Sequence, residues 1–243
     1  RPTDIIVVVA IFIWMASWAC KALIEACSPA RVSMRGLEKK ALARLFVAAL
    51  EGSNMDVAEL AEELGLSEEE CEELLGGLAR EGLVSVREAG GGKEAYELTE
   101  KGRKALRVVM TGGVFDIIHV GHLATLEAAR ALGDVLVVVI ARDSTVERLK
   151  GRRPLNPEGH RLELVSALKP VDAAVLGDPG DPYRTVELIG PDVIALGYDQ
   201  KHDEDEIRAE LEKRGLRADV VRLDVEVPEI KSSKILMRLL NEL

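Results

Sequence analysis

One stretch of the chain reads TGGVFDIIHVGH, from Thr111 to His122; it follows the apolar run Leu106–Thr111 and leads into the amphipathic segment His122–Leu132. The order is a strand, a glycine turn and a His-x-Gly-His sequence that opens a helix. Gly112 and Gly113 allow the backbone to approach a ligand closely. The N–H groups and the dipole of a helix start favour an anion such as a phosphate. The stretch therefore predicts a phosphate-binding turn after a first strand.

Two imidazoles, His119 and His122, stand beside this predicted anion site. They can donate hydrogen bonds to phosphate oxygens and, when protonated, neutralise charge that develops during a reaction. The chain has only 4 histidines. Two of them three residues apart, at a glycine-bounded helix start, indicate a functional pair rather than two unrelated surface residues.

The rest of residues 106–243 alternates apolar, β-branched runs with amphipathic helices, which predicts a Rossmann-like α/β domain with a parallel sheet covered on both faces. Strands are expected at 106–111, 135–140, 173–176, 193–196 and 219–223, and helices at 122–132, 145–149, 157–168, 183–189 and 203–214. Ligands of such sheets bind beyond the carboxyl ends of the strands. The chemistry is therefore expected just after Met110, Ile140, Leu176 and Leu196.

Residues 34–105 precede this domain and resemble a small winged-helix domain, with a helix, a helix-turn-helix and a glycine-tipped hairpin. Such a domain usually binds DNA through its third helix. Here that helix opens with Glu68, Glu69 and Glu70, which phosphate groups would repel. Domain packing or dimerisation is the expected use, and DNA contact through Arg87, Lys93 and the wing is the alternative.

Residues 1–33 form a hydrophobic extension in which Ile5–Cys20 carries no charge. The run is shorter than the roughly 20 apolar residues of a membrane-spanning helix. Three interpretations remain open: a short membrane anchor, a helix packed on the rest of the protein, and a stretch outside the functional protein. The third arises because Met34 begins a sequence typical of a natural start.

The composition limits the classes of protein that need to be considered. The 243 residues include 42 Asp and Glu against 32 Lys and Arg, for a net charge of −10. This disfavours sequence-independent nucleic-acid binding, which depends on basic residues. Three scattered cysteines, Cys20, Cys27 and Cys71, suit neither a disulfide framework nor a zinc site. A cytoplasmic location is expected, with membrane association through residues 5–20 as the alternative.

A basic run follows the second predicted strand, at the edge where the ligand is expected; its members are Arg148, Lys150, Arg152 and Arg153. Its functional interpretation is a clamp on a triphosphate or an acceptor phosphate, and the alternative is a solvated loop. Arg142, directly after the strand, either shapes the next turn or touches phosphate. A divalent metal, Mg²⁺, is expected on a triphosphate because it offsets leaving-group charge. No carboxylate cage marks a site for it.

The motif GGVFDIIHVGH resembles the signature of the HxGH nucleotidyltransferases, which transfer a nucleoside monophosphate from a nucleoside triphosphate to a phosphate-bearing acceptor. The resemblance extends over nearly all of Arg107–Leu243. The later stretches ALGYDQKHDEDEIRAELEKRGL and EIKSSKIL are similar to those of archaeal FAD synthases (FMN adenylyltransferases) and of closely similar archaeal cytidylyltransferase-like domains.

The resemblance implies a nucleotide site around the first turn, formed by Val114, Phe115, His119, Val120, Gly121 and His122. The two histidines would bind the triphosphate and stabilise the transition state at the α-phosphorus. Asp116 would orient the loop.

The resemblance also implies roles for later residues. Asp199 would contact the base or ribose. Ser232, Ser233 and Lys234 would form a second phosphate clamp at the start of a final helix.

The activity that the resemblance implies is transfer of AMP from ATP to FMN, giving FAD and pyrophosphate. The acceptor is already an anion, so the reaction needs placement and charge stabilisation rather than a strong base. One alternative is a CTP-dependent cytidylyltransferase that acts on a polyol phosphate such as glycerol phosphate. Another is a nucleotide-sensing winged-helix regulator. We expect the protein to be a homodimer.

Overall fold

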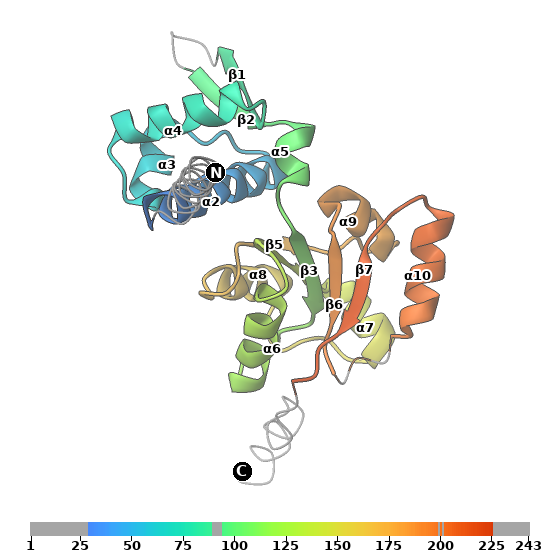
Figure 1. Cartoon of the computed structure of the whole chain (residues 1–243). Helices are drawn as coiled ribbons and strands as arrows, with labels where there is room; N and C mark the ends of the chain where they lie inside the picture. The colour runs from blue at the N-terminus through green and yellow to red at the C-terminus, as the bar shows by residue number, and fades with distance from the viewer. Residues whose placement is uncertain (1–28, 89–93, 199, 201, 226–243) are drawn as a thin grey trace, which may run out of the picture.

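The structure, a computed structural model, describes residues 29–88, 94–198, 200 and 202–225. An N-terminal unit of helices and one hairpin sits above a C-terminal unit built around a parallel sheet (Figure 1). Within the described residues, no helix combines the length and the apolar character needed to cross a bilayer. The run at residues 5–20, on which the membrane question depends, lies outside the described residues.

The N-terminal unit consists of α2 (Pro29–Glu51), α3 (Val57–Leu64), α4 (Glu68–Arg80), β1 (Val84–Glu88), β2 (Glu94–Leu98) and α5 (Glu100–Lys104). Ser67 and Glu70 form the capping box at the start of α4, and Gly65 ends α3 in the left-handed conformation. Helix α2 begins at Pro29, so one continuous helix crosses the domain boundary predicted at residue 34. The assignment of this unit to the winged-helix class stays a prediction.

The C-terminal unit contains one five-stranded sheet in the order β5-β4-β3-β6-β7, with every pair parallel. Its strands are β3 (Val108–Gly113), β4 (Val135–Ile140), β5 (Ala173–Leu176), β6 (Val193–Leu196) and β7 (Asp219–Arg222). This confirms the predicted Rossmann-like α/β fold. The first strand starts two residues later than predicted, because the Leu106 N–H bonds back to the Arg103 carbonyl in the turn that ends α5.

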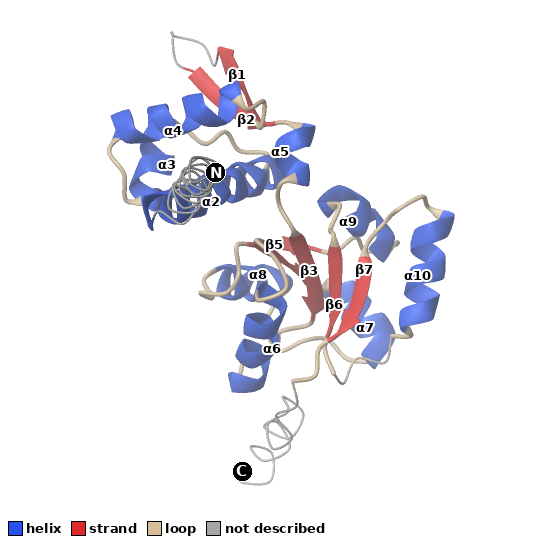
Figure 2. Cartoon of the chain, viewed as in Figure 1, coloured by secondary structure: helices blue, strands red, loops and turns tan. Residues whose placement is uncertain are grey.

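Helices cover both faces of the sheet (Figure 2). They are α6 (Val120–Arg130), α7 (Asp143–Lys150), α8 (Glu158–Ser166), α9 (Pro182–Ile189) and α10 (Glu204–Lys213). Leu126 of α6 and Val165 of α8 pack on one face. Ile189 of α9 and Leu211 of α10 pack on the other. Strand β4 is apolar throughout because both of its faces are buried.

Aspartates at the amino ends of the strands hold neighbouring strands together. The Oδ2 atom of Asp134 accepts the Arg107 N–H at 2.9 Å, and that of Asp192 accepts the Val108 N–H at 2.7 Å. Each carboxylate thus accepts a hydrogen bond from a backbone N–H group at the amino end of β3, where no carbonyl of a neighbouring strand accepts it.

The N-terminal unit docks on these same aspartates. Lys39 Nζ lies 2.7 Å from Asp134 Oδ1, and Arg103 Nη1 lies 3.1 Å from Asp192 Oδ2. The Arg103 guanidinium also stacks 5.3 Å from the centre of the Phe46 ring. Burial raises the pKa of Asp134, but its bonds to Lys39 and to the backbone outweigh this and leave the pKa below its ordinary value. The unit is therefore attached at the amino end of the sheet.

Candidate active site

The topology itself locates the candidate site. Strand β3 lies at the centre of the sheet, with β4 on one side and β6 on the other. The chain order changes direction at this position, and in open α/β sheets the ligand crevice lies at such a point, outside the carboxyl ends of the strands. The segments that leave the carboxyl ends of β3 and β6 are residues 114–119 and 197–203. The side chain of Gln200 ties the second segment to the end of β3 by donating to the Gly112 carbonyl oxygen at 2.7 Å.

Phe115 shapes the turn after β3. Its φ of 51° is the only positive φ at a non-glycine position in the described part of the chain. Its ring is buried, with 6% of the residue exposed, and it lies beside Gly113. A Cβ atom on Gly113 would stand 2.8 Å from Phe115 Cε2, so only glycine fits there without a shift. The sequence predicted that this glycine lets a ligand approach the backbone. In the structure, the Phe115 ring occupies the space beside Gly113.

The two histidines of the motif lie together. Their ring centres are 4.0 Å apart, with an angle of 32° between the planes. His119 is the N-cap residue of α6, and its side chain makes no capping hydrogen bond. The ring of Phe115 packs against the ring of His122, with 5.4 Å between the ring centres. Both residues are half-buried, and the Nδ1 atom of each imidazole is buried.

Asp116 ties this turn to the segment before α8. Its carboxylate accepts the backbone N–H groups of Leu155 and Asn156, each at 2.9 Å. The Asn156 side chain in turn donates to the Asp116 carbonyl oxygen at 2.7 Å. These contacts are the ones that a loop-orienting residue would make.

Arg161 is a residue that sequence reasoning missed. Its guanidinium is fully buried and donates to the carbonyl oxygens of Val114 (2.5 Å), Ala141 (2.8 Å) and Asn156 (2.9 Å). It also lies 2.6 Å from Asp143 Oδ1. Three segments around the site are therefore held by one side chain.

A signal for Arg161 does exist in the sequence. Arg161 and Val165 are four residues apart and are the two buried residues of α8. Positions four apart share a helix face. An arginine on the apolar stripe of a short helix is unusual, because a buried charge requires partners.

Arg142 is bound within the turn that follows β4. Its Nε donates to the Gly177 carbonyl at 2.9 Å, and its Nη1 lies 2.8 Å from Glu158 Oε1. The Asp143 N–H donates to the same carboxylate at 2.8 Å. The bond from Asp143 and the pairing with Arg142 hold the pKa of Glu158 below its ordinary value. These contacts correspond to the turn-shaping alternative for Arg142; its contact with phosphate stays a prediction.

The other clamp candidates lie at the end of α7 and just beyond it. Lys150 and Arg152 are exposed. Arg153 pairs with Glu147 at 3.0 Å, and Arg148 lies 3.4 Å from the Pro179 carbonyl. They belong to the segment that follows the carboxyl end of β4, the neighbour of β3 in the sheet. The remaining predicted residues, Asp199, Ser232, Ser233 and Lys234, lie outside the described residues.

These features define a Rossmann-like α/β protein of the nucleotidyltransferase type. Residues 110–238 match the family model described as cytidylyltransferase-like, and the chain belongs to that family.

Two relatives named FAD synthase agree with this assignment. A protein named FAD synthase from Aciduliprofundum boonei is 60% identical over 115 residues, covering 47% of this chain and 76% of its own length. An FAD synthase from Methanothrix thermoacetophila is 51% identical over 142 residues, covering 58% of this chain and 98% of its own. A crystal structure titled as the lipopolysaccharide core biosynthesis protein from Thermoplasma volcanium is 48% identical, covers 50% of this chain and 98% of that chain, and has a TM-score of 0.48.

Proposed function

We propose that the protein is an FMN adenylyltransferase that converts ATP and FMN to FAD and pyrophosphate. The observation that carries the proposal is the similarity to proteins named FAD synthase, at 60% identity for the relative from Aciduliprofundum boonei. The close imidazole pair after the carboxyl end of β3 supports it, because this is where a triphosphate would be held.

The reaction follows from the chemistry of its two substrates. An oxygen of the FMN phosphate attacks the α-phosphorus of ATP, a new P–O bond forms, and the bond between the α-phosphorus and the bridging oxygen to the β-phosphorus breaks. Pyrophosphate leaves with the electron pair of that bond. His119 and His122 donate hydrogen bonds to the triphosphate oxygens and stabilise the charge that grows on them. No proton needs to be removed from the acceptor.

The loops supply the rest of the nucleotide site in this proposal. The backbone of Val114 and Phe115 and the N–H groups at Val120 and Gly121 face the triphosphate, and Lys150 and Arg152 close over the phosphates. Asp199 contacts the base or ribose, and Ser232, Ser233 and Lys234 form the second clamp.

Magnesium ion is part of the proposal as a companion of the triphosphate. In the described part of the chain, no cluster of three or more His, Cys, Asp or Glu side chains is arranged to hold a metal ion. An ion bound mainly through phosphate oxygens and water suits the preferences of Mg²⁺. It would offset charge on the leaving group when bound.

We propose further that the N-terminal unit, residues 34–105, is a winged-helix domain used for packing rather than for DNA binding. The three glutamates in the first turn of α4 support this, since they would face the DNA phosphates. Arg87 of the hairpin is paired with Glu97 at 2.7 Å, which reduces the positive charge that the wing could offer. DNA titration at low salt tests this: saturable, salt-dependent binding would overturn it.

The decisive experiment for the enzyme compares two substrate pairs. Purified protein is incubated with ATP and FMN, or with CTP and glycerol phosphate, and pyrophosphate and the nucleotide product are measured. FAD formation with the first pair is the expected result. Pyrophosphate release with the second pair alone would overturn the proposal.

A further inference from the structure

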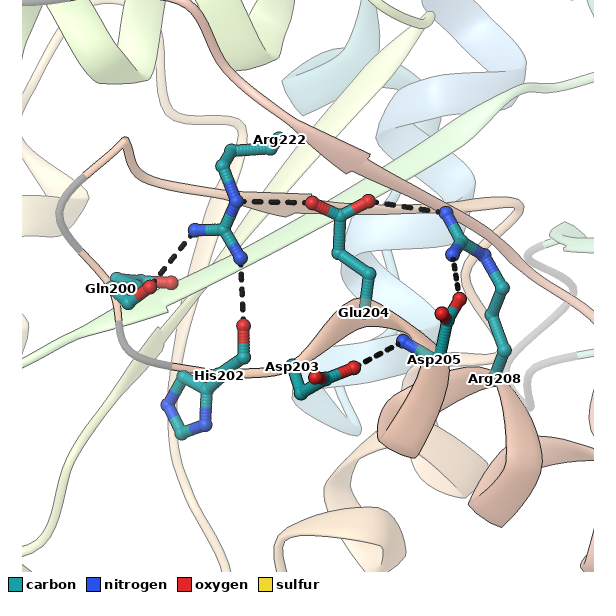
Figure 3. Close-up of a pocket in the computed structure, with 7 residues that line it drawn as sticks. All are labelled: Gln200, His202, Asp203, Glu204, Asp205, Arg208 and Arg222. Carbon is teal, nitrogen blue, oxygen red and sulfur yellow. Dashed lines mark hydrogen bonds and ion pairs between the residues drawn. The ribbon is translucent and has the colours of Figure 1, made fainter.

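A single arginine organises the segment that follows β6. Arg222 is the last residue of β7 and pairs in register with Leu196, the last residue of β6. Its Nη1 donates to the carbonyl oxygens of Gly197 (3.2 Å) and Gln200 (2.8 Å), and its Nη2 donates to that of His202 (2.7 Å). All three acceptors belong to the segment between β6 and α10, and Figure 3 shows the bonds to Gln200 and His202.

Glu204 fixes the direction of the guanidinium. Its Oε1 lies 3.0 Å from Arg222 Nε, and its Oε2 lies 3.2 Å from Arg208 Nη2. Arg208 continues the network by donating to the Val220 carbonyl at 2.9 Å. The guanidinium of Arg222 thus already bonds to the loop carbonyls and to one carboxylate, although about a third of the side chain (32%) is exposed.

The loop that Arg222 holds also touches the first strand. Gln200, whose carbonyl accepts from Arg222, donates from its side-chain Nε2 to the Gly112 carbonyl oxygen at 2.7 Å. Gly112 is the next-to-last residue of β3, and the turn that carries Phe115 and the imidazole pair begins two residues later. Arg222, Gln200 and Gly112 therefore form a continuous chain of hydrogen bonds from β7 to the candidate active site.

We propose that Arg222 is a positioning residue for nucleotide binding, which acts through Gln200 by fixing the distance between the segment after β6 and the turn after β3. Of its five N–H donors, three are used by the loop carbonyls and one by Glu204, so in this proposal it acts by holding the loop rather than by touching the substrate. A hollow of about 550 Å³ lies beside this network and leaves space into which the loop could move if the guanidinium were removed. The inference rests on the proposed function in one respect: the nucleotide is taken to bind between these two segments.

The test uses the full-length protein and three variants. Arg222→Ala removes the guanidinium group. Gln200→Leu removes the side-chain hydrogen bond to the Gly112 carbonyl and leaves Arg222 in place. Arg208→Ala is the matched control, because it removes an arginine of the same network whose hydrogen bonds go to Glu204, Asp205 and the Val220 carbonyl rather than to the carbonyls of Gly197, Gln200 and His202. Calorimetric titration with ATP and with CTP gives the dissociation constant, and steady-state assays give KM and kcat.

Arg222→Ala and Gln200→Leu should each weaken binding of the nucleotide and raise its KM by about tenfold or more, with a smaller change in kcat. A misplacement on the order of 1 Å can cost roughly 100-fold, so a tenfold effect is a moderate expectation. Guanidinium ion added at millimolar concentration should restore part of the affinity of Arg222→Ala only. Arg208→Ala should stay within about threefold of the wild type.

Nucleotide affinity within about twofold of the wild type in Arg222→Ala would overturn the inference, as would an equal loss in Arg208→Ala. If Arg222→Ala does not fold, Gln200→Leu decides the question alone, since it leaves every contact of Arg222 intact. If the wild type binds ATP or CTP but forms no FAD, the proposed function fails while the inference can still be tested by calorimetry.

Discussion

Arg161 and Val114 are 47 residues apart in the chain and are joined by a 2.5 Å hydrogen bond from Nη1 of the arginine to the carbonyl oxygen of the valine. The guanidinium is fully buried, so this bond is not shared with solvent. Val114 begins the turn that leads to Phe115 and the imidazole pair. The position of that turn thus depends on a side chain of α8 that lies beneath it.

Replacing Arg161 by methionine should lower both stability and activity. The carbonyl oxygens of Val114, Ala141 and Asn156 would each lose a donor, and leaving one buried acceptor unpaired costs about 1–3 kcal/mol. Urea unfolding should therefore give a free energy of unfolding lower by about 3 kcal/mol. Arg153→Met is the control, because that arginine is largely exposed and its ion pair is worth about 0–1 kcal/mol. A loss below 1 kcal/mol for Arg161→Met would refute the assigned role.

Gly113 and Gly112 offer a matched pair of alanine substitutions. A Cβ atom at Gly113 would meet the Phe115 ring at 2.8 Å, whereas one at Gly112 would lie 3.5 Å from the nearest atom, an ordinary contact. Forcing an extra methyl group into a packed site costs about 1–3 kcal/mol. Chemical unfolding should show that loss for Gly113→Ala and a clearly smaller one for Gly112→Ala. Equal losses would mean that the ring is not what requires the glycine.

The imidazole pair gives the most direct test of the candidate active site. His119→Ala or His122→Ala should reduce turnover of ATP and FMN by about 100-fold or more, the scale for losing one electrostatic donor. His160→Ala, which removes an exposed imidazole on α8, is the control. Turnover within a few fold of the wild type in either test variant would remove that histidine from the site.

Stability should depend on pH through Glu158. Its hydrogen bonds from Asp143 and Arg142 hold its pKa below the ordinary value. The stabilisation is therefore fully present above the unfolded-state pKa, about 4.3, and is lost as the pH falls through the lowered folded-state pKa. At pH 7, Glu158→Gln should reduce the free energy of unfolding by about 1 kcal/mol. The gap between variant and wild type should narrow in acid, and a gap that is constant down to about pH 3 would contradict this account.

The strands were the most predictable part of the fold. Residues 135–140, 173–176 and 193–196 are strands with the predicted bounds, because continuous apolar runs suit a parallel sheet that is covered on both faces. Helix starts were less predictable. Helix α6 begins at Val120 rather than at His122, because its cap is His119, whose side chain makes no capping bond that a sequence pattern would reveal.

The candidate site was predictable only in its chemistry. His119 and His122 could be found because their spacing and their glycine neighbours belong to one short stretch. Arg161 and Arg222 could not be found in the same way, because they bind backbone carbonyls that are far away in the sequence. Every residue has a backbone carbonyl oxygen, so the sequence does not show which carbonyl an arginine side chain will bind.

The attachment of the N-terminal unit at Asp134 and Asp192 has a practical consequence. Strand β3 has six residues, so its two ends are about 20 Å apart. A protein immobilised on a surface through its N-terminal unit would thus present the imidazole pair to the bulk liquid, away from the support. Substrates and products could exchange there without passing the anchored side.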